Sequence, residues 1–181
     1  RRVLFRSVSM LISLKEILDL AEAKKFAVPA FNVYNMETVM GVIAAAEEMN
    51  APIILQCYSR LFTNGEGYYL SPVIVAAAKA AKVPVAFHLD HGASESEVIK
   101  AVRYGATGVM IDKSTLSLEE NIEGTKNVVD LCKDIDVAVE GELGHIGFAA
   151  KGDEKTIAYT EVADAKRFVE ETGVAALAIM V

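Results

Sequence analysis

Residues 83–92 read V-P-V-A-F-H-L-D-H-G, an apolar run that leads directly into two imidazoles and a carboxylate. Val85 and Phe87 are typical strand formers, and Gly92 lets the chain turn. Strands of a parallel sheet are buried on both faces, so their polar groups belong at their C-terminal ends. The stretch therefore predicts a buried parallel strand over residues 83–89 that ends at a cluster of reactive side chains.

The polar cluster itself consists of His88, Asp90 and His91. Imidazoles are common metal ligands, and a neighbouring carboxylate suits a general acid or base. The structural alternative is a pair of core histidines satisfied by the backbone, with Asp90 capping the next helix. Titratable groups gathered at a strand end usually mark a site, which favours the functional interpretation.

The rest of the chain alternates strand patterns with amphipathic helix patterns in units of roughly 25–35 residues, as α/β proteins do. Strands are predicted at residues 28–33, 52–57, 83–89, 108–112, 137–143 and 175–181. Helices are predicted at residues 14–25, 36–49, 70–82, 94–104, 117–133 and 160–172. Ser71 and Pro72 suggest the start of the third helix, and two Ser-x-x-Glu capping boxes open the fourth and fifth helices.

Polar residues at the ends of five successive strands favour a closed barrel over a doubly wound sheet. In a (β/α)8 barrel every strand contributes to one catalytic rim, whereas a doubly wound sheet concentrates its ligands at one switch point. No glycine-rich dinucleotide or phosphate-loop motif occurs in the sequence, which weakens the nucleotide-binding alternative. We expect a TIM barrel, of which residues 10–181 form about the first six strands and the N-terminal portion of one domain.

Composition excludes several classes of protein. The formal net charge of −7 argues against nucleic-acid binding, which needs a basic surface. No apolar run approaches the ~20 residues that span a bilayer, so no membrane partner is expected. Two cysteines without metal-ligand spacing are typical of reduced thiols and a cytoplasmic protein. Residues 1–9 precede Met10 and match no later pattern, so we interpret them as a non-native or disordered leader.

Further carboxylates follow the later strands. Glu140 and Glu142 are two residues apart on a strand, so both point to the same side, where each would raise the pKa of the other without a compensating cation. A metal would be such a cation, and an ion pair with Lys113 is the alternative. Asp112 could be a ligand or a cap for the helix that follows.

These segments resemble the class II, metal-dependent ketose-bisphosphate aldolases. The stretch at residues 83–92 is similar to the first signature of the family, and residues 139–144, V-E-G-E-L-G, are similar to the second. Residues 28–33 and 109–114 match as well, and the tagatose- and fructose-bisphosphate aldolases are the most similar subgroup. The chain departs from the family at Tyr58, where a small phosphate-binding hydroxyl residue is usual.

The resemblance implies a (β/α)8 barrel that cleaves fructose or tagatose 1,6-bisphosphate into dihydroxyacetone phosphate and glyceraldehyde 3-phosphate. It implies one catalytic Zn²⁺ held by three histidines, of which His91 matches the first, and a possible second metal site at Asp112 and Glu142. Asp90 matches the residue that moves the proton of the substrate C4 hydroxyl. We expect three further site residues from the same comparison: Asn32 and Ser59 for the substrate, and Glu154 as the acid of a mobile loop.

Two competing functions remain open. One is a Schiff-base aldolase on the same barrel that uses Lys113, and the other is a non-catalytic sugar-phosphate-binding or assembly subunit, because a fold does not determine function. The leading prediction is a lyase of carbohydrate metabolism, such as glycolysis, that acts as a dimer or tetramer when full length. The later histidines of the zinc site are expected beyond residue 181, so this chain alone should be inactive.

Overall fold

The computed structural model describes residues 9–146 and 157–181. Its main feature is a six-stranded sheet in which all neighbouring strands are parallel. The strands, in their order across the sheet, are β1 (Ala30–Asn32), β2 (Ile53–Tyr58), β3 (Val85–Gly92), β4 (Gly108–Ile111), β5 (Ala138–Leu143) and β8 (Ala176–Ile179). A short antiparallel pair, β6 (His145–Ile146) and β7 (Ile157–Ala158), lies between β5 and β8 in the chain.

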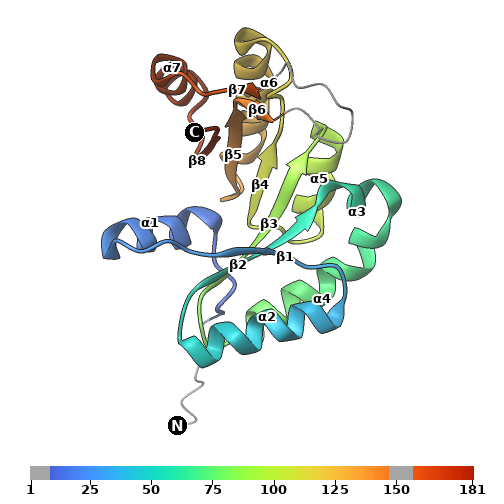
Figure 1. The fold of residues 1–181 in the computed structure, drawn as a ribbon. Helices are drawn as coiled ribbons and strands as arrows, with labels where there is room; N and C mark the ends of the chain where they lie inside the picture. The colour runs from blue at the N-terminus through green and yellow to red at the C-terminus, as the bar shows by residue number, and fades with distance from the viewer. Residues whose placement is uncertain (1–8, 147–156) are drawn as a thin grey trace.

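Helices connect the strands (Figure 1). They are α1 (Leu14–Lys24), α2 (Met36–Met49), α3 (Ser59–Asn64), α4 (Glu66–Ala80), α5 (Glu95–Arg103), α6 (Leu118–Cys132) and α7 (Val162–Thr172). The order of the six strands in the sheet equals their order in the chain. A doubly wound sheet reverses its strand order at a switch point, so this order is that of a barrel wall. The prediction of six consecutive barrel strands is confirmed.

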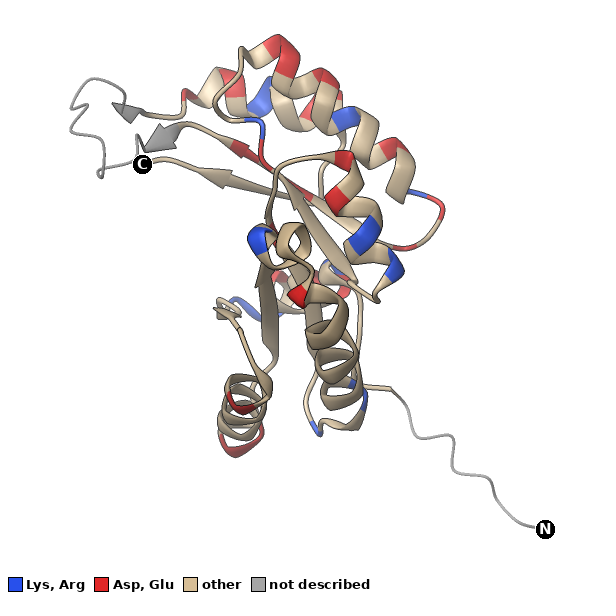
Figure 2. Cartoon of the chain, turned by 90° about the vertical axis from the view of Figure 1, so that its right-hand side faces the viewer, with Lys and Arg blue, Asp and Glu red and all other residues tan. Residues whose placement is uncertain are grey.

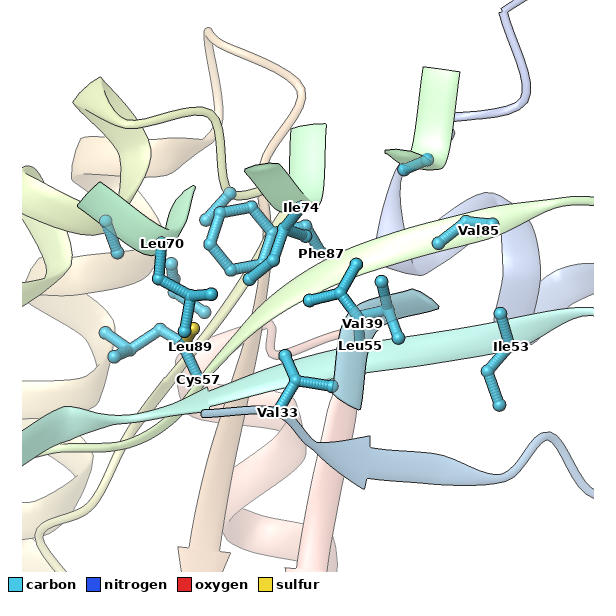
Figure 3. Close-up of a cluster of buried hydrophobic side chains, with 14 of the residues drawn as sticks. Val33, Val39, Ile53, Leu55, Cys57, Leu70, Ile74, Val85, Phe87 and Leu89 are labelled. Atoms are coloured by element: carbon cyan, nitrogen blue, oxygen red, sulfur yellow. The ribbon is translucent and has the colours of Figure 1, made fainter. Parts of the chain in front are cut away.

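Alternate residues of the strands pack against the outer helices. Leu55 and Phe87 are fully buried on this side, together with Ile74 of α4. Figure 3 shows side chains of this cluster and labels Val33, Val39, Ile53, Leu55, Cys57, Leu70, Ile74, Val85, Phe87 and Leu89. Because side chains alternate along a strand, the residues between them must face the inside of the barrel wall.

The inner face is apolar at one end and polar at the other. Ile54 and Ala86 lie at the N-terminal ends of their strands and form a second core with Leu14 and Ile17 of α1. Helix α1 therefore covers the bottom of the barrel wall, across the sheet from α2 and α4 (Figure 1). The same inner face continues toward the C-terminal ends as His88 and Asp90, which places the polar groups above an apolar plug.

The start of one predicted helix was wrong. Residues 70–82 were expected to form a helix opened by Ser71 and Pro72, but α4 begins at Glu66 and carries Pro72 in its interior. The preceding Gly65 has a φ of +99° and both ends α3 and begins α4, so a glycine supplied the helix boundary. Ser71 is fully buried, and its hydroxyl has no hydrogen-bond partner among the described residues. The loop expected before residue 70 is instead mostly helical, because α3 and the first turn of α4 lie there.

The two capping boxes had different outcomes. Ser117 and Glu120 form the predicted box at the start of α6. At α5, Ser94 accepts a hydrogen bond from the backbone of Glu97, but the Glu97 carboxylate accepts from Ala93 N and Thr63 Oγ1 instead of closing the box. Glu97 therefore ties α5 to α3 and to the chain that leaves β3.

Charged residues lie mainly on the helices and loops, while most of the sheet carries none (Figure 2). None of the helices in the described part of the chain is long and apolar enough to cross a membrane. The interpretation of residues 1–9 as a leader concerns residues of which only Ser9 is described, and Glu154 also lies outside the described residues.

Candidate metal centre and active site

A β-bulge at the end of β3 presents two of the predicted site residues. Leu89 pairs with Val109 of β4, but the next pair along the ladder joins Gly92 to Ile111, so β3 has an additional residue. Bulges re-aim side chains next to active sites. Here the bulge contains Asp90 and His91, which the sequence had placed just beyond the strand.

The backbone of the bulge is unusual at two positions. His91 has a φ of 51°, in the left-handed region that costs a non-glycine residue of order 1 kcal/mol. A Cβ on Gly92 would lie 2.5 Å from Met110 O, so only glycine fits between β3 and β4. The strained conformation is held in place by its neighbours, as is usual at functional sites.

His91, Asp112 and Glu142 form a group that could hold a metal ion. Their ligand atoms all lie within 4.8 Å of one another, and each side chain is partly buried. His91 Nδ1 is 2.9 Å from Asp112 Oδ2 and 3.5 Å from Glu142 Oε2. The structure thus brings together, from the ends of β3, β4 and β5, the three residues that the sequence proposed as metal ligands. Asp112 also accepts hydrogen bonds from Ser114 N and Oγ, whereas Ser117 caps the next helix.

The charges of this group shift the protonation of its members. The hydrogen bond with Asp112 is the main cause that raises the pKa of His91 to about 9; burial opposes it, and Asp90 and Glu142 add to it. The same hydrogen bond, supported by Ser114 and opposed by burial, lowers the pKa of Asp112 to about 2. In the metal-free protein His91 is therefore protonated at neutral pH, and its imidazolium supplies a positive charge among these carboxylates.

Asp90 points into the same site and is held by two amide side chains. Asn32 Nδ2 donates to Asp90 Oδ2 at 2.8 Å, and Gln56 Nε2 donates to Asp90 Oδ1 at 3.3 Å. Asn32, expected to contact the substrate, here orients the proposed acid–base residue. Gln56 was missed by the sequence reasoning. Its signal was its place on the second predicted strand, two residues after the inner-facing Ile54.

His88 and Glu140 form a deeper layer of the inner face. His88 is 1% exposed, and its Nδ1 faces Gln56 Nε2 at 3.4 Å. Its Nε2 lies 3.2 Å from Glu140 Oε2 without the alignment of a hydrogen bond. Burial first, and then the charge of His91, lowers the pKa of His88 to about 3, so it is a neutral core histidine. Of the two imidazoles at this strand end, His88 is therefore a core histidine and His91 is not, although the ring nitrogens of His88 face the side chains of Gln56 and Glu140 and not the backbone.

Glu140 and Glu142 share the inner side of β5, as their spacing predicted, although Lys113 is not their partner. Burial, followed by the charges of Asp90 and Glu142, raises the pKa of Glu140 to about 7. Lys113 Nζ instead donates to Ala93 O at 3.0 Å. This hydrogen bond connects Lys113 to the loop after β3. Lys113 is not among the residues that line the cavity. This placement disfavours the Schiff-base alternative.

The groups surround a cavity of about 820 Å³. Ser59, expected to bind substrate, lines it as the first residue of α3, beside Tyr58, whose ring meets that of His91 edge-on at 6.2 Å. The described lining contains four carboxylates and no lysine or arginine: Asp90, Asp112, Glu140 and Glu142. This part of the cavity is suited to a cation.

Comparison with known proteins agrees with the resemblance seen in the sequence motifs. The profile of the family "Fructose-bisphosphate aldolase class-II" matches residues 12–181. A curated fructose-bisphosphate aldolase from Thermus caldophilus is 42% identical over 175 residues, which are 95% of this chain and 57% of the relative. The chain thus spans little more than half the length of this relative.

Solved structures agree with this match. The YdjI aldolase from Escherichia coli K12 superposes with a TM-score of 0.85 at 36% identity, over 94% of this chain and 62% of that one. A putative fructose-1,6-bisphosphate aldolase from Coccidioides immitis superposes with a TM-score of 0.81 at 29% identity, over 92% of this chain and 59% of that one. With its sequence, barrel course and site all in agreement, the chain belongs to the class-II fructose-bisphosphate aldolase family.

Proposed function

We propose that the protein containing this chain is a zinc-dependent aldolase that cleaves a ketose bisphosphate, fructose or tagatose 1,6-bisphosphate, into dihydroxyacetone phosphate and glyceraldehyde 3-phosphate. The observation that carries the proposal is the convergence of His91, Asp112 and Glu142 beside Asp90 in one cavity. In the cleavage, the C4 hydroxyl loses its proton, the C3–C4 bond breaks, and its electron pair moves toward the C2 carbonyl. The reaction therefore needs a base and a stabiliser of negative charge.

The residues present fit a divalent cation. Four carboxylates face one cavity whose described lining contains no lysine or arginine, and the hydrogen bond with Asp112 raises the pKa of His91 to about 9, so the site favours positive charge. An imidazole and carboxylate oxygens are ligands that zinc accepts. His91, Asp112 and Glu142 would hold the ion, which would supply Lewis-acid stabilisation of the developing oxyanion. The resemblance implies further histidine ligands from segments that are not in this sequence.

Asp90 would act as the base. Its two oxygens are held by the amide groups of Asn32 and Gln56, so the carboxylate is oriented before substrate arrives. It would accept the proton of the C4 hydroxyl during cleavage and return it during condensation. Ser59 would contact the substrate from the cavity wall, and Glu154 would supply the acid of a mobile loop.

We propose, further, that the active form is the longer protein, working in the cytoplasm as a dimer or tetramer in carbohydrate metabolism. The length of the relatives supports the first part. The two cysteines, Cys57 and Cys132, are buried and free, and burial raises the pKa of Cys57 to about 12, which suits unreactive thiols in a reducing compartment.

The test is a cleavage assay of the full-length protein with fructose and tagatose 1,6-bisphosphates, before and after treatment with EDTA. We expect activity that EDTA abolishes and Zn²⁺ restores. Borohydride is added with substrate in a parallel sample, and a control carries Lys113→Met. Activity that persists in EDTA, together with borohydride inactivation lost in the Lys113 variant, would replace the metal mechanism by a Schiff base. Absence of cleavage with both substrates would favour a binding subunit.

A further inference from the structure

Asn121 connects α6 to the end of β5 from within the core. The side chain is 1% exposed, which is rare for an asparagine. Its Nδ2 donates to Glu142 O at 2.8 Å, and its Oδ1 accepts from Thr125 Oγ1 at 3.1 Å. Both functional ends of the amide are therefore used, so its orientation is fixed. A buried polar group of this kind is retained only where its hydrogen bonds are made.

The residue that Asn121 holds is one of the three proposed metal ligands. Glu142 is followed at once by Leu143 and Gly144, and Gly144 has a φ of 87°, so the strand ends there. The next carbonyl, Leu143 O, accepts a hydrogen bond from Thr160 Oγ1 at 2.6 Å. Two successive carbonyls at the end of β5 are thus bound by side chains from outside the sheet.

Helix α6 is a rigid support for this contact. Its start is fixed by the Ser117–Glu120 capping box, and Asn121 is the next residue. Residues Ile122 and Val128 of the same helix are buried in the core, so α6 cannot shift without disturbing packing. A displacement of the Glu142 backbone would move its carboxylate away from His91 Nδ1, which is now at 3.5 Å.

We propose that Asn121 is a positioning residue for the metal centre: by binding Glu142 O it fixes the carboxylate of Glu142 opposite His91 and Asp112. The inference rests on the proposed function, because it assigns Asn121 to the outer shell of the proposed site. Outer-shell partners orient ligands, and their loss commonly costs about 10–100-fold in metal affinity. Asn121 is not among the residues that line the cavity, so its effect should be on metal affinity and not on the chemical step.

The test is a titration of the metal-free, full-length protein with Co²⁺, followed by its visible absorption, in the parent and in Asn121→Leu. Leucine has a similar size but cannot donate to Glu142 O. We expect Asn121→Leu to bind Co²⁺ about 10–100-fold more weakly and with an altered spectrum, at a temperature where it is fully folded. Ser13→Ala is the control, because it removes another buried side-chain hydrogen bond, from Glu16 N to Ser13 Oγ at the start of α1, which covers the opposite end of the sheet.

Each outcome decides the proposal. Parent affinity and spectrum in a folded Asn121→Leu protein would overturn it, as would an equal loss in Ser13→Ala. Thr125→Val keeps the amide and removes only its hydroxyl partner, so it is used if Asn121→Leu does not fold. We expect a smaller loss of affinity in that variant, and an unchanged affinity would reject the proposal. If the His91→Ala variant binds Co²⁺ as tightly as the parent protein does, the proposed metal site is wrong, and so is the role of Asn121.

Discussion

The His91–Asp112 pair should make the stability of the metal-free protein fall as the pH rises from about 7.5 to about 9.5. The folded pKa of His91, about 9, is above its ordinary value of 6.5. A raised imidazole pKa gives stability that is fully present below the unfolded value and is lost as the pH rises through the folded value. Glu140 has a raised pKa of about 7, so the stability that its protonated form contributes is mostly lost below this pH range. Its titration therefore adds little to the change expected for His91.

The magnitude follows from the shift and from the exposure of the ring. The part of the shift between about pH 7.5 and 9 corresponds to about 2 kcal/mol, because each pKa unit is worth about 1.4 kcal/mol. The His91 side chain is 43% exposed, so solvent screening reduces this value to about 1 kcal/mol. Stabilities of this size change the midpoint of thermal unfolding by about 2–4 °C in a domain of similar length.

Urea unfolding of the EDTA-treated protein at the two pH values measures the effect. Asp112→Asn removes the main cause of the raised pKa and should lose a large part of the pH dependence. Asp19→Asn is the control, since it removes one carboxylate from an exposed pair with Lys15 that contains no histidine. An equal fall of stability in the parent and in Asp112→Asn would refute the reasoning. So would a His91 pKa near 6.5, measured by NMR in the metal-free parent.

Three substitutions, one of them paired with a control, test further parts of the site. Asp90→Ala in the full-length protein should lower kcat by about 10²–10⁴ while metal content and fold are retained; an equal loss of metal would show that the residue is structural. His91→Ala should abolish zinc binding, and stoichiometric zinc by atomic absorption would contradict its assignment. Gly92→Ala should destabilise the protein by about 1–3 kcal/mol in urea unfolding, because its Cβ would meet Met110 O. Gly41→Ala, in open space on α2, should instead stabilise it by roughly 0.5–1 kcal/mol, and similar losses in both would reject the steric argument.

The alternation of elements could be predicted because each signal is local. Asn35 caps α2 and Ser117 caps α6 as their side-chain chemistry requires, and the bounds of α2 match the prediction. The start of α4 could not be obtained in this way. Pro72 has the local signature of a first helical turn, but the helix begins at Glu66, about one turn before the predicted start at residue 70 and directly after Gly65. Packing of Leu70 and Ile74 against the sheet outweighs the loss of one backbone donor in that helix.

The grouping of His91, Asp112 and Glu142 could be expected from the sequence, but Gln56 and the geometry of the site could not. The motif that contains Asp90 and His91 identified a functional strand end, and family resemblance added Asp112 and Glu142. The bulge in β3 depends on the register with β4, which a single sequence does not reveal. The same limit applies to Asn121, since an asparagine in a helix is usually exposed. Its only sequence signal was the spacing of four residues to Thr125, which puts both side chains on one face.

The arrangement of charges explains why the separate features occur together. The inner face brings carboxylates from β3, β4 and β5 into one cavity, and such a group is unfavourable unless a positive charge accompanies it. The metal-free protein responds in two ways, by keeping a proton on His91 and by raising the pKa of Glu140 toward neutrality. The second response buries a partly neutral acid, and the site also holds His91 in a left-handed backbone conformation, two costs that packing alone would not select. A cation bound at His91, Asp112 and Glu142 would compensate the repulsion among the carboxylates around it, so the acid cluster is consistent with the binding of a metal ion.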